Sequence, residues 1–375
     1  MLFTAFEPSG DEHASQVIAA LRQRRPDIAI FAAGGPKMKA AGAQIILDTT
    51  HDAVMGIPGL GKILEHKKMN KQIERWLDSN KVALHMPVDS PAANFPISKL
   101  SKARGIPVYQ LVAPQLWAWA PWRIRKTKRL IDKLLCILPF EEDWFRQRGV
   151  DAEYVGHPIF SEIYDDDAID SVAQTLPESE MRLAILPGSR PGEIEKSYPA
   201  MLGAFIELRR RHPDLIGVVA ATNDSLANRI GEIDQEQAGG EVEGLSVVSG
   251  QANAVLRWSR YAMATSGTVT LRACRHQRPL VAMFRIKPLV WNLLGRWLLN
   301  TPFILLPNII MGEEMIPELI PYYGGPQRLT EAMDLLIRDD AAQRTQIEAQ
   351  GELVERFGNH DAAQRAAELI DEAIG

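Results

Sequence analysis

The chain has 375 residues, of which 46% are hydrophobic and 24% are charged, and its formal net charge is -5. Because a single core stops growing at ~250 to 300 residues, this length predicts two domains. The ordinary composition excludes a mostly disordered protein. The acidic balance excludes a general nucleic-acid binder, which would carry a basic surface on the scale of a domain.

The N-terminus runs from MLFTAF directly into EPSGD, without the charged and apolar regions of a signal peptide, so we expect a cytoplasmic protein. Cys136 and Cys274 form neither a disulfide framework nor a zinc spacing, which fits a reducing compartment. Residues 288–310 are strongly apolar but are broken by Arg296 and by prolines, so they make a poor membrane span. A core helix with a strand is one interpretation, and an acyl-chain or membrane-surface contact is the other.

Five short apolar runs each end at a polar or glycine-containing turn that precedes a helical pattern. The runs are residues 2–6, 82–88, 108–112, 183–186 and 261–264. This alternation is typical of βα units that build a parallel sheet. Since the ligands of open α/β sheets bind beyond the carboxyl ends of the strands, each of the five turns is a candidate site.

An acidic, serine-containing segment at residues 164–180 separates the first three runs from the last two. We therefore expect an N-terminal Rossmann-like domain at residues 1–165, a C-terminal one at 166–342 and a helical tail at 343–375. Three consecutive aspartates begin at Asp165, where a solvated acidic face is favoured over a metal site. The eight histidines form no HExxH motif, so no metal is expected.

The first turn, EPSGD, carries Glu7, Ser9, Gly10 and Asp11. Carboxylates there suit hydrogen bonds from sugar hydroxyls better than contact with phosphate, which they repel. A capping role for Ser9 and Asp11 is the alternative. After the second run, Asp89 stands alone at the strand end and is the best candidate for a general base. A turn-forming aspartate before Ser-Pro is the simpler interpretation of the local sequence.

The third turn, APQLWAWAPW, places Gln115 before Trp117 and two further tryptophans, and five cations follow at residues 123–129. Clustered tryptophans after a Pro-Gln pair do not fit the period of a strand or of a buried helix. They indicate a ligand-binding surface, with the basic run meeting an anionic lipid headgroup or a phosphate. A solvated helix face is the alternative. Residues 54–68 raise a similar choice between an interfacial and a core-packed helix.

Two turns of the C-terminal domain have the features of phosphate sites. In LPGSRPGE a glycine turn, a helix start and a forked cation stand together, at Gly188, Ser189 and Arg190. TSGT offers the same backbone chemistry without the charge, at Ser266, Gly267 and Thr268. A left-handed turn with a surface arginine is the alternative for the first of the two.

Ten motifs in this order resemble those of lipid-A-disaccharide synthases, glycosyltransferases of the GT-B fold: EPSGD, GGPKM, VMGIP, VDSP, APQLWAW, LPFE, GHP, LPGSR, SGT and LPNII. The resemblance extends over about residues 7–318. It implies an α/β protein of two doubly wound Rossmann-like domains that face a central cleft. Tails of GT-B proteins often pack back on the N-terminal domain, and we expect the same of residues 343–375.

The resemblance also implies a reaction. A diacylated glucosamine passes from UDP-2,3-diacylglucosamine to 2,3-diacylglucosamine 1-phosphate, which yields lipid A disaccharide 1-phosphate and UDP in lipid A biosynthesis. Members of the family need no metal and bind the inner face of the cytoplasmic membrane peripherally. No cofactor is expected, and the oligomeric state is left open.

Residue roles follow from the same resemblance. Asp89 would take the proton of the acceptor hydroxyl, and Arg190 would neutralise the departing diphosphate, with the SGT residues beside it. Gln115 and Trp117 would lie near Asp89 on the acceptor side. Asn308 of LPNII matches a family position that lines the cleft.

Four departures from the family pattern concern Phe6 in place of Gly, Ala92 and Ala93 in place of an acid and an aromatic, Ala120 in place of an occasional Arg, and Arg272 in place of Glu. In related GT-B enzymes that glutamate bonds the nucleotide ribose. Its loss would weaken donor binding by one to two powers of ten, or ~1.5–3 kcal/mol, unless Arg272 reaches the diphosphate instead. The acceptor side is therefore expected to be better preserved than the donor side.

Two other functions stay open on the sequence. One is a diverged GT-B protein that binds nucleotide sugar or lipid with little or no transfer. The other is a GT-B enzyme that acts on soluble UDP-hexosamines, such as an epimerase or another hexosaminyl transferase. Release of UDP that requires both acylated sugars would distinguish the leading hypothesis from these two.

Overall fold

A computed structural model of the chain describes residues 1–49, 60–286, 288, 291 and 299–375. The chain forms two compact units, which we call the first unit (Met1–Ser161 with Phe357–Gly375) and the second unit (Glu162–Arg356). The segments 54–68 and 288–310, for which a membrane-surface contact was one interpretation, lie partly outside the described residues.

The first unit contains, among the described residues, seven strands whose pairings are parallel. Four form a sheet in the order β3-β2-β1-β4 and three form a sheet in the order β5-β6-β7. Parallel bridges from His85 to Val108 and from Val88 to Leu111 connect β4 to β5. The strands are β1 (Leu2–Thr4), β2 (Phe31–Gly34), β3 (Gln44–Asp48), β4 (His85–Pro87), β5 (Tyr109–Leu111), β6 (Lys133–Cys136) and β7 (Ala152–Tyr154).

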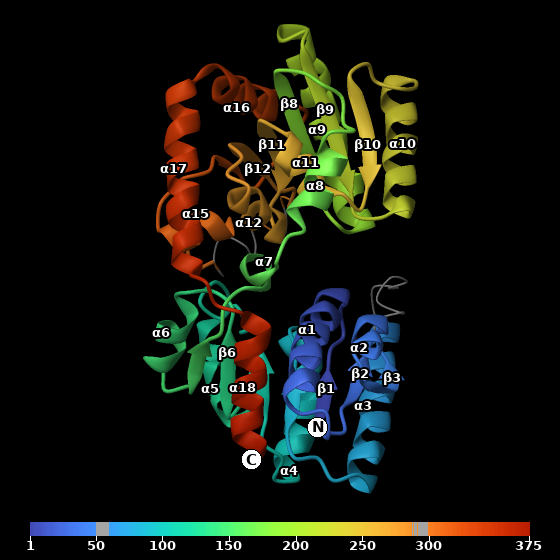
Figure 1. The fold of residues 1–375 in the computed structure, drawn as a ribbon, viewed down its shortest axis with the longest axis vertical. Helices are drawn as coiled ribbons and strands as arrows, with labels where there is room; N and C mark the ends of the chain where they lie inside the picture. Colours follow the sequence, from blue (N-terminus) through green and yellow to red (C-terminus); the bar gives the residue numbers. More distant parts are fainter. Residues whose placement is uncertain (50–59, 287, 289–290, 292–298) are drawn as a thin grey trace. The chain divides into compact units, whose positions relative to one another are not determined.

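Helices cover both faces of this sheet. They are α1 (Pro8–Arg24), α2 (Pro36–Ala40), α3 (Leu60–Ser79), α4 (Pro91–Ala103), η2 (Pro121–Arg123), α5 (Ile124–Leu130), α6 (Glu141–Arg146), α7 (Pro158–Ser161) and α18 (Ala362–Ile374). Leu2 and Ala33 of the sheet pack with Ile73 of α3 and Ile97 of α4 in one apolar cluster. In front of the sheet in Figure 1, α1 packs against α18, so the end of the chain completes the first unit.

The second unit has, among the described residues, six parallel strands in the order β10-β9-β8-β11-β12-β13. Their bounds are β8 (Met181–Leu186), β9 (Leu215–Ala221), β10 (Leu245–Ser249), β11 (Tyr261–Thr265), β12 (Leu280–Met283) and β13 (Glu318–Leu319). The helices are α8 (Asp166–Ala173), α9 (Pro191–Arg211), α10 (Asp224–Ala238), α11 (Ala252–Trp258), α12 (Thr268–Arg275), α15 (Leu306–Met311), α16 (Gln327–Arg338) and α17 (Asp340–Phe357).

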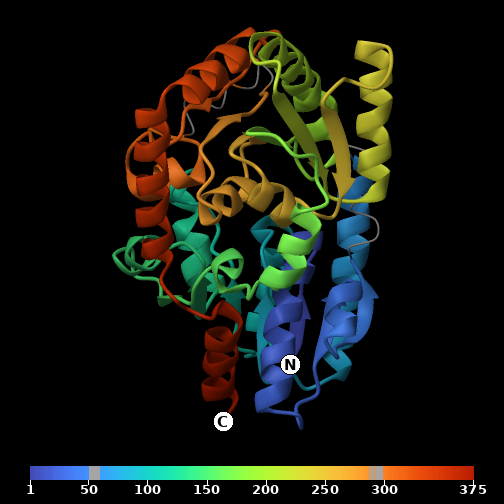
Figure 2. The ribbon, with the colours of Figure 1, turned by 45° about the horizontal axis from the view of Figure 1, so that its top comes forward.

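A large apolar core lies under three helices of the second unit. Val219, Met263 and Val281 of the strands pack there with residues of α9, α10 and α16. The helices α11 and α12 contact β8, β9 and β11 outside that core. At the edge of the sheet α10 runs beside β10, as both views show (Figure 1, Figure 2).

Both units are therefore α/β layers with a parallel sheet, as the alternating sequence pattern predicted. The strand order reverses between β1 and β4 in the first unit and between β8 and β11 in the second. At such a reversal the loops beyond the carboxyl ends of neighbouring strands lead away to helices on opposite faces, which opens a crevice for a ligand. Helices start immediately there because proline, which suits the first helical turn, begins α1, α4 and α9.

No helix among the residues that the structure describes is long and apolar enough to span a bilayer. The predicted tail at residues 343–375 is divided between the units. Nearly all of α17 belongs to the second unit, whereas α18 belongs to the first.

Candidate functional site

The reversal point of the first unit brings Asp89, after β4, together with the start of α1. The hydroxyl of Ser9 donates a hydrogen bond to Oδ2 of Asp89 over 3.1 Å. The backbone N–H of Ser90 donates to Oδ1 of Asp89 over 2.7 Å. The Ser90 hydroxyl in turn donates to Oε1 of Glu7 over 2.9 Å. Two carboxylates that are distant in sequence thus lie within one small hydrogen-bonded group, and Asp89 itself is only half-buried.

The backbone at this point is unusual for residues with side chains. Asp89 and Ser90 have φ values of 52° and 37°, in the left-handed region that L-residues rarely adopt. Gly10 permits the close approach of α1, because a Cβ there would lie 3.0 Å from Cβ of Ala5 and 3.3 Å from the carbonyl oxygen of Val88. Strained backbone of this kind is characteristic of functional sites.

Asp11 was predicted with this group, but its carboxylate points elsewhere. It is buried and accepts backbone N–H bonds from Gly35, Lys37 and Met38 over 2.9, 3.0 and 3.1 Å. These are donors of the first turn of α2, so Asp11 caps that helix from α1. Capping was the alternative that the sequence left open for Asp11, and substrate contact by this residue stays a prediction.

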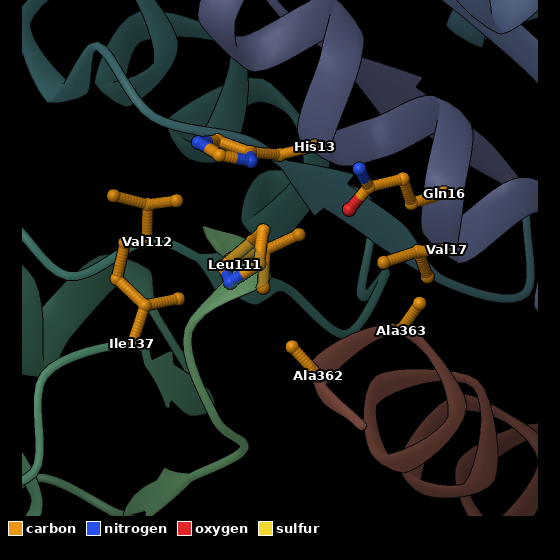
Figure 3. A pocket seen from close by; sticks show the side chains of 9 residues that line it. His13, Gln16, Val17, Leu111, Val112, Ile137, Ala362 and Ala363 are labelled. Carbon is orange, nitrogen blue, oxygen red and sulfur yellow. The ribbon is translucent and has the colours of Figure 1, made fainter. Parts of the chain in front are cut away.

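A histidine that the sequence did not single out lies close to this group. Figure 3 shows the imidazole of His13 beside a small, mostly apolar cavity in the first unit, lined by Gln16, Val17, Leu111, Val112, Ile137, Pro158, Ala362 and Ala363. Burial lowers the pKa of His13, while the negative charge of Asp89 opposes that shift. Its Nδ1 is buried and has no hydrogen-bond partner among the described residues.

The tryptophan-rich turn divides into a buried and an exposed part. Trp117 is buried, and its indole N–H donates to Oε1 of Glu141 over 3.0 Å. Oε2 of Glu141 accepts the N–H of Leu138 over 3.1 Å, and burial raises the pKa of Glu141 to about 7. Trp117 thus packs inside the first unit, while the side chain of Gln115 is exposed.

The exposed part of the turn is aromatic and basic. Trp119 and Trp122 are 39% and 63% exposed. The cations that follow on η2 and α5 are exposed as well: Arg123, Arg125, Lys126, Lys128 and Arg129. We call these two tryptophans and five cations the basic aromatic surface. The exposed aromatic and basic side chains of this segment therefore come after Trp117, and ligand binding by them stays a prediction.

In the second unit, the two predicted phosphate turns leave neighbouring strands at the same edge. β8 and β11 pair with Leu186 opposite Ala264, so the turn at Gly188 and the turn at Ser266 follow directly. Gly188 has a φ of 114°, and a Cβ there would lie 2.7 Å from Oε2 of Glu193. The left-handed backbone therefore favours the glycine that the sequence predicted for this turn, and a Cβ there would also displace the Glu193 carboxylate.

Glu193 organises the cationic turn of the second unit. Its Oε2 accepts the N–H of Ser189 over 3.2 Å, and its Oε1 pairs with Nη1 of Arg190 over 3.0 Å. The Arg190 side chain is still 68% exposed. Gly267 caps α12, which begins at Thr268 after β11, and Arg190 caps α9 after β8. Backbone N–H groups of two helix starts therefore lie at this edge with a solvent-exposed guanidinium. This combination can receive an anion.

The guanidinium of Arg272 bonds to α11 and to the segment before α8. Its Nη1 donates to Oδ1 of Asn253 over 2.9 Å and to Oε2 of Glu162 over 3.3 Å. One turn along α12, Nη2 of Arg275 donates to the carbonyl oxygen of Glu162 over 2.6 Å. The guanidinium carbon Cζ of Arg275 lies 3.6 Å from the centre of the Tyr164 ring. Arg272 therefore has partners within the second unit that the sequence did not predict.

Asn308 is fully buried. Its Nδ2 donates to the carbonyl oxygen of Ile316 over 2.8 Å and to Oε2 of Glu318 over 3.2 Å, and its Oδ1 accepts the N–H of Ile316 over 3.0 Å. The amide thus connects α15 to the start of β13. Ligand contact by Asn308 stays a prediction. Among the described residues no group of three or more His, Cys, Asp or Glu side chains could hold a metal ion.

Comparison with known sequences gives matches along the full length of the chain. A family model described as Lipid-A-disaccharide synthetase matches residues 1–373. The chain is 36% identical to the lipid-A-disaccharide synthase of Myxococcus xanthus (strain DK1622), over 100% of this chain and 97% of that protein. It is 33% identical to that of Anaeromyxobacter dehalogenans (strain 2CP-1 / ATCC BAA-258), over 99% of this chain and 96% of that protein.

Comparison with solved structures concerns the fold. A glycotransferase of kitacinnamycin has a TM-score of 0.67 at 16% identity and covers 100% of this chain and 99% of its own. The S. aureus MnaA-UDP co-structure has a TM-score of 0.63 at 13% identity and covers 99% and 94%. The α/β GT-B fold predicted from the sequence is thereby confirmed.

Proposed function

The chain belongs to the lipid-A-disaccharide synthase family and is a glycosyltransferase of lipid A biosynthesis, and we propose that Asp89 is the base of its reaction. The proposed donor is UDP-2,3-diacylglucosamine and the proposed acceptor is 2,3-diacylglucosamine 1-phosphate. The acceptor oxygen attacks the anomeric carbon of the donor while its proton passes to the carboxylate of Asp89. UDP leaves, and lipid A disaccharide 1-phosphate is formed.

The observation that carries this proposal is the arrangement around Asp89. Its carboxylate accepts hydrogen bonds from Ser9 and from the N–H of Ser90. Asp89 and Ser90 hold the left-handed backbone conformation there, which is costly for residues other than glycine. These bonds orient the carboxylate while it stays half-buried and accessible. A positioned carboxylate of this kind can take a proton in the transition state. Glu7 and Ser90 supply further groups suited to sugar hydroxyls.

For the donor we propose the carboxyl edge of β8 and β11. The exposed guanidinium of Arg190 would neutralise charge on the UDP diphosphate, and the first turns of α9 and α12 would supply N–H donors. The first unit would then handle the acceptor and its acyl chains, and the second unit the UDP-sugar. No cofactor is part of the proposal.

We further propose peripheral contact with the inner face of the cytoplasmic membrane, through the basic aromatic surface. Tryptophan suits the interface between headgroups and acyl chains, and exposed Lys and Arg attract anionic lipids. Trp119, Trp122 and the five cations that follow them are exposed in the first unit. Both substrates carry acyl chains, so an enzyme at the membrane surface would meet them there.

The test is release of UDP by the purified chain in the presence of both acylated sugars. Replacing Asp89 by Asn removes the base, and we expect kcat to fall by about 10²–10⁴-fold. Arg190→Ala removes a charged hydrogen-bond donor, and we expect about a 10–100-fold loss of kcat/KM.

Matched controls separate these effects from loss of charge. Asp167→Asn removes an exposed aspartate of α8. Arg210→Ala removes an arginine that also pairs with a glutamate three residues away on α9 and is 74% exposed. Both controls should keep the wild-type rate. Equal rates for Asp89→Asn and wild type would contradict the assignment of the base, and turnover of non-acylated UDP-hexosamines would contradict the assignment of the substrates.

A further inference from the structure

A continuous chain of buried hydrogen bonds leads to Asp89 from the interior of the first unit. Nδ1 of His85 lies 2.9 Å from the hydroxyl of Ser101, and Nε2 of His85 lies 2.9 Å from the hydroxyl of Thr4. The Thr4 hydroxyl donates to Oδ1 of Asn94 over 2.6 Å. All four side chains have no exposed surface. They lie between β1, β4 and α4, beneath the turn that carries Asp89.

The two ends of the Asn94 amide are distinguished by their partners. Its Nδ2 donates to the carbonyl oxygen of Val88 over 3.1 Å and to that of Asp89 over 2.8 Å. Backbone carbonyl oxygens can only accept, so the NH₂ group must face them and Oδ1 must face Thr4. Oδ1 can only accept as well, and the single hydroxyl proton of Thr4 is therefore given to Asn94.

The direction of the remaining bonds follows from this. Because the Thr4 proton is used, Nε2 of His85 must carry a proton and donate it to the oxygen of Thr4. Burial lowers the pKa of His85 to about 3, so the ring is neutral at neutral pH and its Nδ1 is an acceptor. Ser101 then donates to Nδ1. One proton arrangement satisfies all four side chains, and it selects a single tautomer of His85.

The chain ends at the backbone on both sides of the Asp89 α-carbon. Asn94 donates hydrogen bonds to the carbonyl oxygens of Val88 and of Asp89 itself, which lie on either side of that α-carbon. Rotation of Asp89 and Ser90 out of their left-handed conformations would move these carbonyl groups and break the bonds to Asn94. The same left-handed conformation directs the carboxylate to Ser9 and to the N–H of Ser90.

We infer that Thr4, His85 and Asn94 are positioning residues for the carboxylate of Asp89. They act through the backbone: the directional chain from Ser101 orients the Asn94 amide, and the amide holds the strained turn in the conformation that presents the carboxylate. This inference rests on the proposed role of Asp89 as the base. It predicts that breaking this chain of hydrogen bonds inside the first unit slows the proton transfer without weakening substrate binding.

Thr4→Val tests the inference, because valine keeps the shape of threonine and removes the hydroxyl. Oδ1 of Asn94 then loses its donor and Nε2 of His85 its acceptor. We expect kcat for UDP release to fall about tenfold, equivalent to ~1.4 kcal/mol, with the KM values of both sugars within about twofold of wild type. Thr4→Ser restores the hydroxyl and should recover the wild-type kcat.

Two further variants separate positioning from general loss of packing or stability. Thr127→Val removes another fully buried hydroxyl of the first unit, on α5, which has no hydrogen-bond partner among the described residues, and it should leave kcat unchanged. Ser101→Ala removes the hydrogen bond to His85, at the end of the hydrogen-bond chain farthest from Asp89, and we expect kcat to fall about threefold. Ser101→Ala also decides the question if Thr4→Val does not fold. Each kcat is corrected for the folded fraction, measured by thermal unfolding.

The outcomes distinguish this inference from the proposed function. If Asp89→Asn is inactive but Thr4→Val and Ser101→Ala turn over like Thr127→Val, the positioning inference is overturned and the role of Asp89 stands. A rise in KM at unchanged kcat in Thr4→Val would also overturn it, because the chain would then act on binding. If Asp89→Asn keeps the wild-type rate, the proposed function itself fails.

Discussion

Two nearby residues of one turn, Ser9 and Asp11, make different contacts in the first unit. Ser9 and Asp11 are two positions apart on α1, and helical geometry separates their directions by about 200°. Ser9 therefore faces Asp89, while Asp11 faces the start of α2. A short motif such as EPSGD predicts which residue types gather at a strand end. The direction of each side chain depends on the helix that follows.

Arg272 illustrates the same point in the second unit. The sequence predicted contact with the donor or loss of a ribose contact, and both stay predictions. The guanidinium pairs with Glu162 and Asn253, and the Arg272 side chain is 26% exposed. Arg272→Glu would place a carboxylate against Glu162 and remove a hydrogen bond to Asn253. We expect the free energy of unfolding to fall by roughly 1–2 kcal/mol, measured by urea denaturation.

Two companion variants test that explanation. The charge swap Arg272→Glu with Glu162→Arg should recover most of the lost stability, because the ion pair is restored with its signs exchanged. Arg210→Glu reverses the charge of a more exposed arginine, also paired with a glutamate, and should lower stability less. A swap variant that is no more stable than Arg272→Glu would contradict the pairing with Glu162.

Glu141 predicts a pH dependence of stability. Its folded-state pKa is raised by burial from 4.5 to about 7, so between these values the folded protein holds a proton that the unfolded chain releases. Stability from this group is present below pH 4.5 and is lost as the pH rises through 7. The linked free energy is on the order of 3 kcal/mol. Glu141→Gln should remove this loss.

The measurement is the difference in unfolding free energy between wild type and Glu141→Gln from pH 4.5 to 7. His85 has the opposite sign, because its folded pKa is lowered to about 3 and stability is lost as the pH falls from 6.5 toward 3. That contribution is common to both proteins and cancels in the difference. A difference that does not change with pH would contradict the raised pKa of Glu141.

At the scale of elements, the last helix of the chain completes the first unit. α18 places Ala366, Leu369 and Ile370 in the core, and its Asp371 pairs with Arg25 just after α1 over 2.8 Å. Arg365 of the same helix donates to Glu153 of β7 over 2.7 Å. The sequence predicted a helical tail but not the point at which it divides, which is the short connection between α17 and α18.

Ile370 tests the contribution of α18. Its side chain is fully buried, and Ile370→Ala should lower the stability of the first unit by about 2–5 kcal/mol through lost contacts and a cavity. Hydrogen exchange of peptides from α1 and β1 reports this unit separately from the second. Leu64→Ala on α3, where the side chain is 66% exposed, is the control and should change exchange little. Equal protection in wild type and Ile370→Ala would show that α18 is not part of the folded unit.

At the scale of the whole molecule, the net charge of -5 conceals a local excess of cations. The basic aromatic surface carries five Lys or Arg residues within residues 123–129, and Trp119 and Trp122 come just before them in the sequence. Surface charges act over about a Debye length, ~8 Å at physiological salt, so the local surface and not the total charge governs approach to an anionic membrane.

Vesicle binding tests this surface. We expect the chain to sediment with vesicles that contain anionic phospholipid, and binding to fall as salt rises. Arg125→Ala should weaken binding about fivefold at low salt, since each cation near the surface contributes ~1 kcal/mol, and Trp122→Ala should weaken it also on neutral vesicles. Arg210→Ala in the second unit should bind as wild type does. Identical binding by all three variants would exclude the basic aromatic surface as the contact.

The sequence by itself determined the α/β class, the strand ends that carry Asp89, Gly188 and Arg190, and the family, because these follow from periodicity and from residues that are neighbours in the chain. The tertiary structure decided which polar groups meet. Thr4 is separated in sequence by 81 positions from His85 and by 90 from Asn94. These residues come into contact only because β1 lies beside β4 in the sheet and because α4 follows β4. Hydrogen-bond partners depend on that order, whereas periodicity reports only which face of an element is buried. The burial of Trp117, the capping of α2 by Asp11 and the pairing of Arg272 with Glu162 depend on packing in the same way.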